Sequence, residues 1–233
     1  NSRPQWRTVK GGARNYVKRL AADLSDIRTG AMLAGVRREE GGAVIDAADG
    51  VERFDHVVFA CHTNETLALL GERSGAVHEV LSKIPYQPNT AILHTDRRQL
   101  PDRKRAWAAW NYTAWHPEAA NGRSAGTAEA PVSLSYLLNR LQPLPFKSPV
   151  IVTMNPLVPP DPATVIQTIS YDHPVFLAES ADAKRALRRL QGKDRLWFAG
   201  AWTRYGFHED GLMSGIAVAR ALLNAHPTCN VII

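Results

Sequence analysis

The stretch at residues 196–223 carries most of the side chains that could bind a ligand. An apolar run at Leu196–Ala199 stops at Gly200, which predicts a buried strand that ends in a tight turn. The loop after it is rich in ligand-binding types: Trp202, Thr203, Arg204, Tyr205, His208, Glu209 and Asp210. Helical spacing of the apolar residues then predicts a helix from about Gly211, with Asp210 as N-cap and an inward stripe of Leu212, Ile216, Ala219 and Leu223.

A strand, a polar loop and a helix in this order turn the free N–H groups and the positive end of the helix toward whatever lies above the strand. Gly211 and Gly215 leave one helix face without side chains, so a flat ligand or another backbone could lie close to it. An electron-rich ring would suit such a place. The alternative is an ordinary α/β unit whose glycines serve packing alone.

The spacing of the candidate side chains disfavours two other kinds of site, a metal site and a catalytic thiol. His208-Glu209-Asp210 reproduces neither HExxH nor a facial triad, so we expect no metal. Cys61 and His62 are adjacent and would point to opposite faces of a strand, so a catalytic thiol is not expected. Cys61 and Cys229 form no disulfide framework, which favours a reducing cytoplasm.

Composition limits the class of protein. With 233 residues, of which 45% are hydrophobic and 21% charged, the chain can bury one large core or two modest ones. No apolar run approaches the ~20 residues of a membrane span, and no leader pattern is present. The net charge of +6 includes a basic cluster at 184–189. Because no aromatic residues interleave with this cluster, it indicates a solvated helix face rather than a nucleic-acid site.

The N-terminal third predicts a helix followed by strands. Residues 6–22 turn at Gly11-Gly12 and continue as a helix with Tyr16, Val17 and Leu20 inward. A strand at Ile27–Val36 is followed by turns at Gly41-Gly42 and Asp49-Gly50. The run Phe54–Ala60 is apolar on both faces, which is typical of a parallel sheet.

The middle of the chain predicts an antiparallel sheet. Its five strand-like segments are Ala91–Thr95, Ala106–Tyr112, Val132–Asn139, Val150–Asn155 and Thr164–Tyr171, and a Gly/Ala/Ser-rich loop lies at 121–130. Trp110 and Tyr112 either line an apolar pocket or pack on the sheet. His173, which precedes a proline, either faces an active site or caps a turn.

Several motifs give the chain a family resemblance. GAW, RYGFHEDGL and SG occur together at 200–215, and NRLQPLP, Asn155-Pro156 and YDHPVF precede them. With these, residues 5–225 resemble the flavin-containing amine oxidase superfamily, and more closely its bacterial NAD/FAD-binding branch. The resemblance implies an α/β plus α+β fold: an incomplete Rossmann-like FAD-binding domain from 1–72 and 193–225, an inserted, mostly antiparallel substrate domain at 73–192, and a tail at 226–233.

The resemblance also implies the cofactor FAD and a set of residues that bind it: Leu33, Ala60, Cys61, Gly200, Ala201, Glu209, Asp210, Gly211 and Leu212. Arg204, Tyr205 and His208 are the candidates for contact with substrate or the flavin rim. Many relatives carry an acidic residue where this chain has Ala201, so that hydroxyl contact is not expected.

The superfamily's GxGxxG loop, which holds the cofactor diphosphate, is absent from residues 1–233. We therefore expect a C-terminal fragment whose partner is the N-terminal half of the same protein. The implied function is an FAD-dependent oxidoreductase that moves a hydride from an amine, CH–CH or CH–OH bond of a small or lipid-like substrate. The alternatives are a catalytically silent scaffold and a flavin-dependent isomerase.

Overall fold

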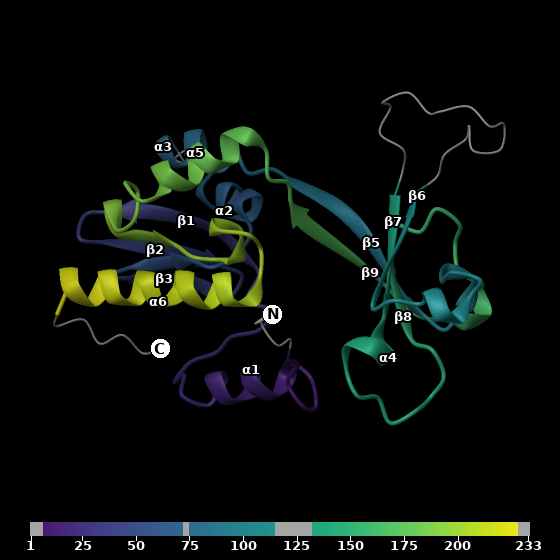
Figure 1. The fold of residues 1–233 in the computed structure, drawn as a ribbon. Coiled ribbons are helices and arrows are strands. Elements are labelled where there is room, and N and C mark those ends of the chain that lie inside the picture. Colours follow the sequence, from purple (N-terminus) through teal and green to yellow (C-terminus); the bar gives the residue numbers. More distant parts are fainter. Residues whose placement is uncertain (1–6, 72–74, 115–131, 228–233) are drawn as a thin grey trace, which may run out of the picture. The chain divides into compact units, whose positions relative to one another are not determined.

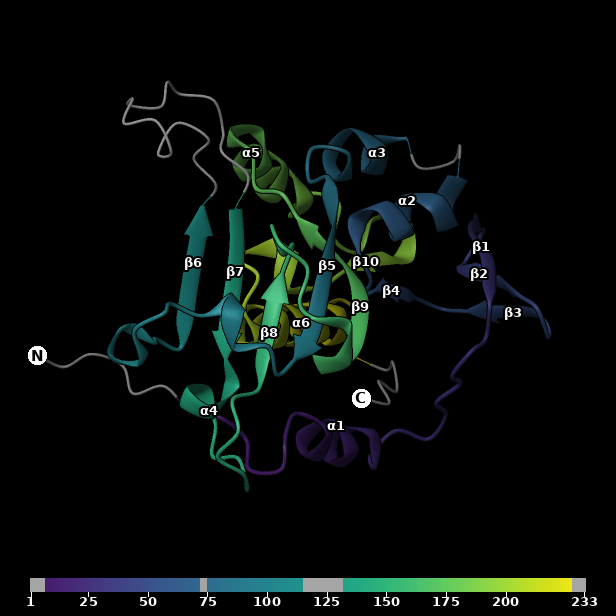
Figure 2. The same ribbon diagram turned by 90° about the vertical axis from the view of Figure 1, so that its right-hand side faces the viewer.

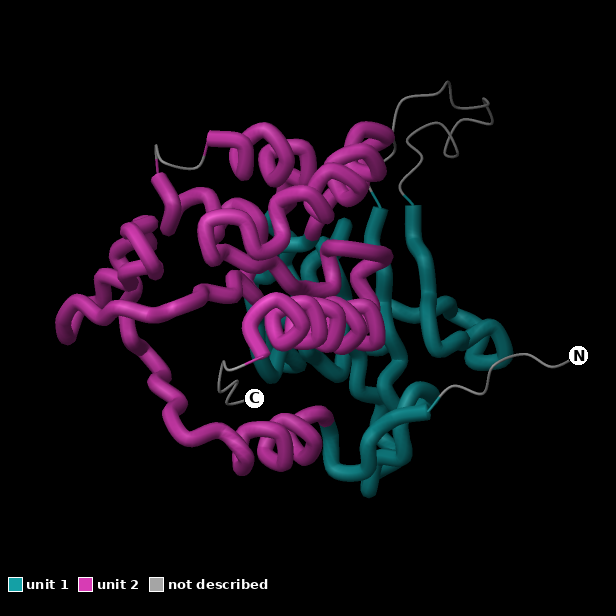
Figure 3. The backbone as a smooth tube through the Cα atoms, turned by 90° about the vertical axis from the view of Figure 1, so that its left-hand side faces the viewer, with its two compact units in different colours: residues 1–12, 88–173 teal, residues 13–87, 174–233 magenta. Residues whose placement is uncertain are grey.

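The computed structural model describes residues 7–71, 75–114 and 132–227. The chain divides into two compact units (Figure 3), which we call the parallel-strand unit, residues 13–87 and 174–233, and the five-stranded unit, residues 1–12 and 88–173. The chain passes between them after Gly12 and within strands β5 (Tyr86–His94) and β9 (Val165–Pro174). The loop expected at 121–130 and Cys229 lie outside the described residues.

The parallel-strand unit contains an antiparallel sheet and several helices (Figure 1). The sheet is β1 (Leu33–Glu39), β2 (Gly42–Ala47) and β3 (Gly50–Phe54), and the predicted hairpin turns are confirmed by its register. β1 begins at Leu33 rather than Ile27, whose side chain is 53% exposed. The helices of this unit are α1 (Arg14–Ala21), α2 (Thr63–Leu70), α3 (Ala76–Leu81), α5 (Ala178–Leu187) and α6 (His208–Ala225).

Two short parallel strands form the centre of this unit. β4 (Val57–Phe59) pairs with β10 (Leu196–Phe198), which confirms a parallel arrangement. The strand is shorter than the predicted run, and it is not buried on both faces: Val57 and Phe59 are buried, but Val58 is 45% exposed. Val58 pairs with Trp197, but the residues of α6 that pack against Trp197 do not cover Val58.

A glutamine side chain covers one edge of β10. The N–H of Phe198 donates to Gln191 Oε1 at 2.9 Å, and Gln191 Nε2 donates to the Phe198 carbonyl at 2.7 Å. The amide therefore takes the place of a neighbouring strand and closes an edge that could otherwise pair with another chain.

The core of this unit lies on both sides of β10. Leu196 and Phe198 pack with β4, α3 and α5, whereas Trp197 and Ala199 pack against Val218 and Leu222 of α6. The predicted inward stripe of α6 is therefore wrong in part: Leu212 and Leu223 are 55% and 38% exposed. The face that is buried depends on where β10 crosses the helix, which spacing alone does not determine.

Helix α1 also differs from its prediction. Tyr16, Val17 and Leu20 were expected to point inward, but they are 37%, 52% and 64% exposed, and no residue of α1 is buried. An amphipathic pattern shows which face is apolar but not whether another element covers it.

The five-stranded unit is a single sheet in the order β6-β7-β8-β5-β9 (Figure 2). β6 (Trp110–Ala114), β7 (Val132–Leu137), β8 (Ile151–Met154) and β5 pair antiparallel, which confirms the predicted sheet, and α4 (Leu138–Leu141) follows β7. β6 begins later than expected, because residues 104–106 form a 3-10 turn. Leu100, Leu137 and Ile151 form its core with Trp107.

The observed architecture is thus a mixed α/β chain with antiparallel sheets and one parallel strand pair. Among the described residues, no helix combines the length and apolar character needed to cross a bilayer.

Candidate functional site

The two parallel strands bring four predicted residues to one edge. Ala60 and Cys61 follow β4, and Gly200 and Ala201 follow β10. The strands stay paired to this edge, where the N–H of Ala199 donates to the Phe59 carbonyl at 2.9 Å. Carboxyl ends of parallel strands are the usual ligand-binding edge of an α/β sheet.

Gly200 is required here by a neighbouring side chain. Its φ is +147°, and a Cβ at this position would lie 2.5 Å from Trp202 Nε1. The buried Trp202 indole donates to the Cys61 carbonyl at 3.1 Å and so ties the end of β10 to the end of β4. The Trp202 indole therefore fills the space in which a side chain at position 200 would lie.

The loop after Gly200 is held by hydrogen bonds to its own backbone. The N–H groups of Arg204 and Gly206 donate to the Ala201 carbonyl, at 3.2 and 3.1 Å. The Gly200 N–H donates to Ser214 Oγ at 2.9 Å, which joins the strand end to the second turn of α6. The position of this helix relative to β10 is thus fixed from both sides of the loop.

Asp210 orders the start of α6, but not as an N-cap. The helix begins at His208, and Asp210 is the third helical residue. Its carboxylate, in a side chain that is only 7% exposed, accepts the N–H groups of Phe207 and Tyr205 at 3.1 and 3.2 Å. This is one half of a capping box, since Phe207 offers no side-chain acceptor. The predicted start at Gly211 was wrong because the reach of this carboxylate back to the loop could not be read from spacing.

The first turn of α6 carries unused donors. In the described part of the chain, the N–H groups of His208 and Glu209 have no acceptor, whereas those of Asp210 and Gly211 bond to the Phe207 carbonyl. The Glu209 side chain is exposed. Gly211 packs on Ala201, because a Cβ there would lie 3.7 Å from the Ala201 nitrogen. This helix end therefore presents two N–H donors and a positive partial charge.

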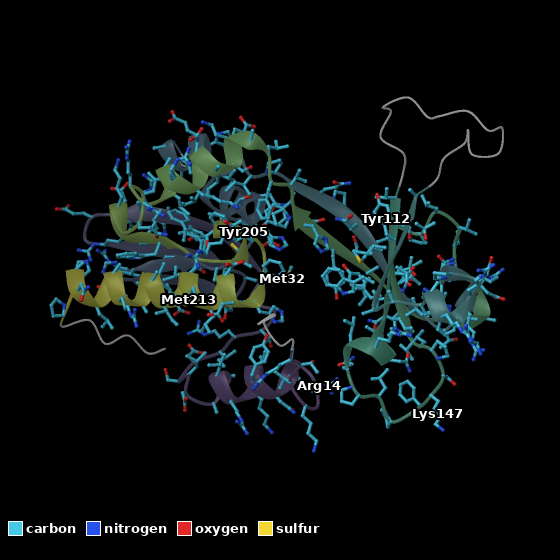
Figure 4. All side chains as sticks on the ribbon, viewed as in Figure 1. Arg14, Met32, Tyr112, Lys147, Tyr205 and Met213 are labelled. Atoms are coloured by element: carbon cyan, nitrogen blue, oxygen red, sulfur yellow. The ribbon has the colours of Figure 1, made fainter. Side chains whose placement is uncertain are left out.

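The three candidates for substrate contact are exposed. Tyr205 is 79% exposed (Figure 4), and the His208 ring meets the ring of Tyr16 edge-on at 6.2 Å. Arg204 lines a cavity of about 410 Å³ together with Lys184. Lys184 Nζ lies 3.7 Å over the Phe176 ring and donates to the Arg204 carbonyl, and burial lowers the pKa of this lysine.

Cys61 and His62 do not form a reactive pair. The Cys61 thiol lies 3.3 Å from Thr66 Oγ1, and the His62 ring stacks on Tyr86 at 4.3 Å. Burial raises the pKa of the Cys61 thiol, which is the opposite of what an activated nucleophile needs. In the described ranges no group of three or more His, Cys, Asp or Glu side chains is placed to hold a metal ion.

Two further cavities contain predicted residues. Leu33, at the start of β1, lines a cavity of about 630 Å³ with Met32, Ile45 and Phe54, so it is not part of the edge formed by β4 and β10. In the five-stranded unit, a cavity of about 610 Å³ is lined by both Trp110 and Tyr112, with Leu100, Leu157 and Val158. Trp110 also meets the ring of its cross-strand partner Tyr136 edge-on at 6.0 Å, so it packs on the sheet as well as lining this cavity.

A family model described as "Flavin containing amine oxidoreductase" matches residues 1–223. The chain belongs to this family. Flavin-containing amine oxidoreductases are FAD-dependent enzymes, which agrees with the resemblance seen in the sequence. No curated protein matches the chain in sequence.

Solved structures show the same fold. A "CLA-producing fatty acid isomerase" from P. acnes has a TM-score of 0.60 at 16% identity, over 90% of this chain and 52% of that one. A "putative protoporphyrinogen oxidase" from Exiguobacterium sp. 255-15 has a TM-score of 0.56 at 14% identity, over 96% of this chain and 53% of that one. This amine oxidoreductase chain therefore spans about half the length of the solved relatives it matches.

The residues present fit FAD only in part. The donors at the start of α6 suit the electron-rich pyrimidine side of a flavin, and Leu33 offers an exposed apolar contact. The diphosphate needs a glycine-rich loop at a helix start, and the sequence contains none of the GxGxxG type. The described residues thus offer donors suited to the ring end of the cofactor, and the sequence offers no loop of this type for its diphosphate.

Trp202, expected among the residues able to contact a ligand, is instead buried with 3% exposure, and Ser214 and Gln191 shape this site but were not assigned in advance. Each acts through a hydrogen bond to the backbone of a residue at least seven positions away, namely Cys61, Gly200 and Phe198. The one local signal was the glycine two residues before Trp202, which leaves room for a large ring to fold back over the chain.

Proposed function

We propose that this chain is the C-terminal part of an FAD-dependent oxidoreductase that transfers a hydride from an unidentified substrate to flavin. The observation that carries the proposal is the helix start at His208, which follows the end of β10 across the loop at 199–207 in a chain that the amine oxidoreductase family model matches. When bound, FAD supplies the hydride acceptor.

The residues of this chain would bind and orient the cofactor. The N–H groups of His208 and Glu209 would donate to the pyrimidine side of the ring, where the positive helix end favours negative charge. Glu209 would accept from a ribityl hydroxyl, and Leu33 would contact the adenine. Asp210 is bound to its own loop, so its role is to hold that loop.

The remaining assignments follow the family resemblance. Ala60 and Cys61 would lie near the diphosphate, Ala201, Gly211 and Leu212 near the flavin, and Arg204, Tyr205 and His208 toward the substrate. In domain terms, residues 1–72 and 193–225 would form part of the FAD-binding domain, 73–192 the substrate domain and 226–233 a tail. An N-terminal half with the glycine loop would complete the site. It would also cover the face of β4 on which Val58 is exposed.

FAD binding tests this proposal. The natural full-length product should show absorbance bands near 370 and 450 nm (roughly, for a protein-held flavin), and this chain alone should not. In the full-length protein, Glu209→Ala should weaken FAD binding about tenfold, since a hydrogen bond to a charged group contributes about 1.5–3 kcal/mol. Glu179→Ala, an exposed acid in the first turn of α5, is the matched control and should bind FAD normally.

Three other outcomes would contradict parts of this proposal. Flavin bands in this chain alone would contradict the need for a second half. The absence of bands in both proteins would favour a catalytically silent scaffold. A full-length protein that binds FAD but isomerises substrates without net oxidation would favour the isomerase alternative.

A further inference from the structure

Three segments far apart in the sequence meet in one hydrogen-bonded chain in the five-stranded unit. Asn89 comes from β5, Asn155 follows β8, and His173 lies near the end of β9. Asn155 Nδ2 donates to Asn89 Oδ1 at 2.6 Å, and Asn89 Nδ2 lies 3.1 Å from His173 Nδ1. Two of these segments, Asn155-Pro156 and YDHPVF, are motifs that the proposed flavin chemistry does not use.

The direction of every bond in this chain is fixed by a backbone group. The N–H of Thr90 donates to Asn155 Oδ1 at 2.9 Å, so the other end of the Asn155 amide is a donor. Asn89 must then accept with Oδ1 and donate with Nδ2. His173 Nδ1 therefore accepts a hydrogen bond, and the proton of the neutral imidazole resides on Nε2.

This arrangement exceeds what the sheet itself needs. Asn155 closes the ladder through its backbone N–H, which donates to the Thr90 carbonyl at 2.8 Å, and through its side-chain oxygen. The continuation to Asn89 and His173 orders exposed side chains at an entropic cost. Asn155 also has a φ of +46°, a region that asparagine adopts more readily than most non-glycine residues.

We propose that His173 is a binding residue whose Nε2–H donates to an uncharged carbonyl oxygen of the substrate, with Asn89 and Asn155 as positioning residues. Within the described residues Nε2 has no partner, and the Tyr171 ring lies 6.3 Å from the imidazole and offers apolar contact. The relay consists of neutral groups only, so it suits a ketone, ester or amide better than a carboxylate. This inference rests on the proposed function, because it assigns the five-stranded unit to the substrate.

An isosteric change of Asn155, which reaches His173 through Asn89, tests the relay. In Asn155→Asp, the Asp carboxylate cannot donate to Asn89, so the Asn89 amide should turn and present its oxygen to His173. The imidazole should then switch from the Nε2–H to the Nδ1–H tautomer. The tautomer is read from the ¹⁵N shifts of the ring at about pH 8. Asn64→Asp, which adds the same charge on the exposed side of α2, should keep the Nε2–H form.

The binding arm uses octanamide as the carbonyl probe and octanoate as its charged counterpart. Octanamide should shift the His173 Nε2–H signal of the wild type but not of Asn155→Asp, and octanoate should have a smaller effect. Should Asn155→Asp not fold, Asn89→Asp makes the same test in direct contact with the ring. Retention of the Nε2–H form in the folded variant, or an equal or absent response to octanamide in both proteins, would overturn the proposal.

These measurements need no flavin and are made on this chain. If this chain shows the tautomer switch but the full-length protein shows no FAD bands, the oxidoreductase is refuted and the carbonyl subsite is kept. If the full-length protein shows FAD bands but this chain shows no tautomer switch, the oxidoreductase is kept and the carbonyl subsite is refuted.

Discussion

At the scale of single residues, a buried histidine links three strands of the five-stranded unit. His94 has no exposed surface, and its Nδ1 accepts the N–H of Asp96 at 3.1 Å. Nε2 must therefore carry the proton and donate to Thr153 Oγ1 at 2.8 Å, which in turn lies 2.9 Å from Ser135 Oγ. The neutral His94 ring satisfies both of its partners. A second proton would lie on Nδ1 and would meet the N–H donor of Asp96.

This burial makes stability depend on pH. Burial lowers the pKa of His94 below its unfolded value, against a smaller opposing effect of the Asp96 carboxylate. The unfolded chain therefore takes up a proton first, so the contribution of His94 is complete above about pH 6.5 and is lost as the pH falls toward the folded pKa. We expect His94→Gln, which can keep both hydrogen bonds, to lose less unfolding free energy between about pH 7.5 and 5.5 than wild type.

Urea denaturation at the two pH values measures this difference. His78→Gln, on the exposed side of α3, should retain the wild-type pH dependence. Equal losses in wild type and His94→Gln would show that another group, such as His56, whose pKa burial also lowers, controls the slope.

At the scale of elements, the turn between β10 and α6 depends on one glycine. Gly200→Ala would place a methyl group 2.5 Å from the Trp202 indole at a positive φ, and the Trp202–Cys61 bond would break. We expect a loss of at least about 1–3 kcal/mol of unfolding free energy from overpacking. Gly215→Ala is the control, because nothing lies within 4 Å of its added Cβ. It should stabilise α6 by about 0.5–1 kcal/mol.

The urea midpoints of the two variants should move in opposite directions. A Gly200→Ala protein as stable as wild type would mean that the Trp202 indole can leave its place without cost. A destabilising Gly215→Ala would mean that this side of α6 is covered.

The same elements show how far the sequence could be read. The hairpins at Gly41 and Gly50 were predictable, because turn residues act locally. The start of α6 and its buried face were not, because the Asp210 carboxylate binds the loop before it and β10 selects the packed face. Ala60, Cys61, Gly200 and Ala201 meet at one edge, as parallel strands require. The Asn89–His173 contact spans 84 residues, and no local pattern could predict it.

At the scale of the whole molecule, the chain has separate cores. Leu196 belongs to the core of the parallel-strand unit, and Ile151 to that of the five-stranded unit. The chain passes from one unit to the other at three places: between Gly12 and Ala13, within β5 and within β9. Units with their own cores can unfold in separate steps, in which case one unfolding free energy does not describe the molecule.

Two cavity-forming variants test this division, and each is the control for the other. Leu196 is 1% exposed and Ile151 0%, so Leu196→Ala and Ile151→Ala should each cost about 2–5 kcal/mol. If the units unfold independently, calorimetry resolves two transitions, and each variant lowers the temperature of one only. Leu196→Ala should also reduce the near-UV signal of its neighbour Trp197, whereas Ile151→Ala should leave that signal intact. A single transition that both variants lower equally would show that β5 and β9 couple the two cores into one cooperative fold.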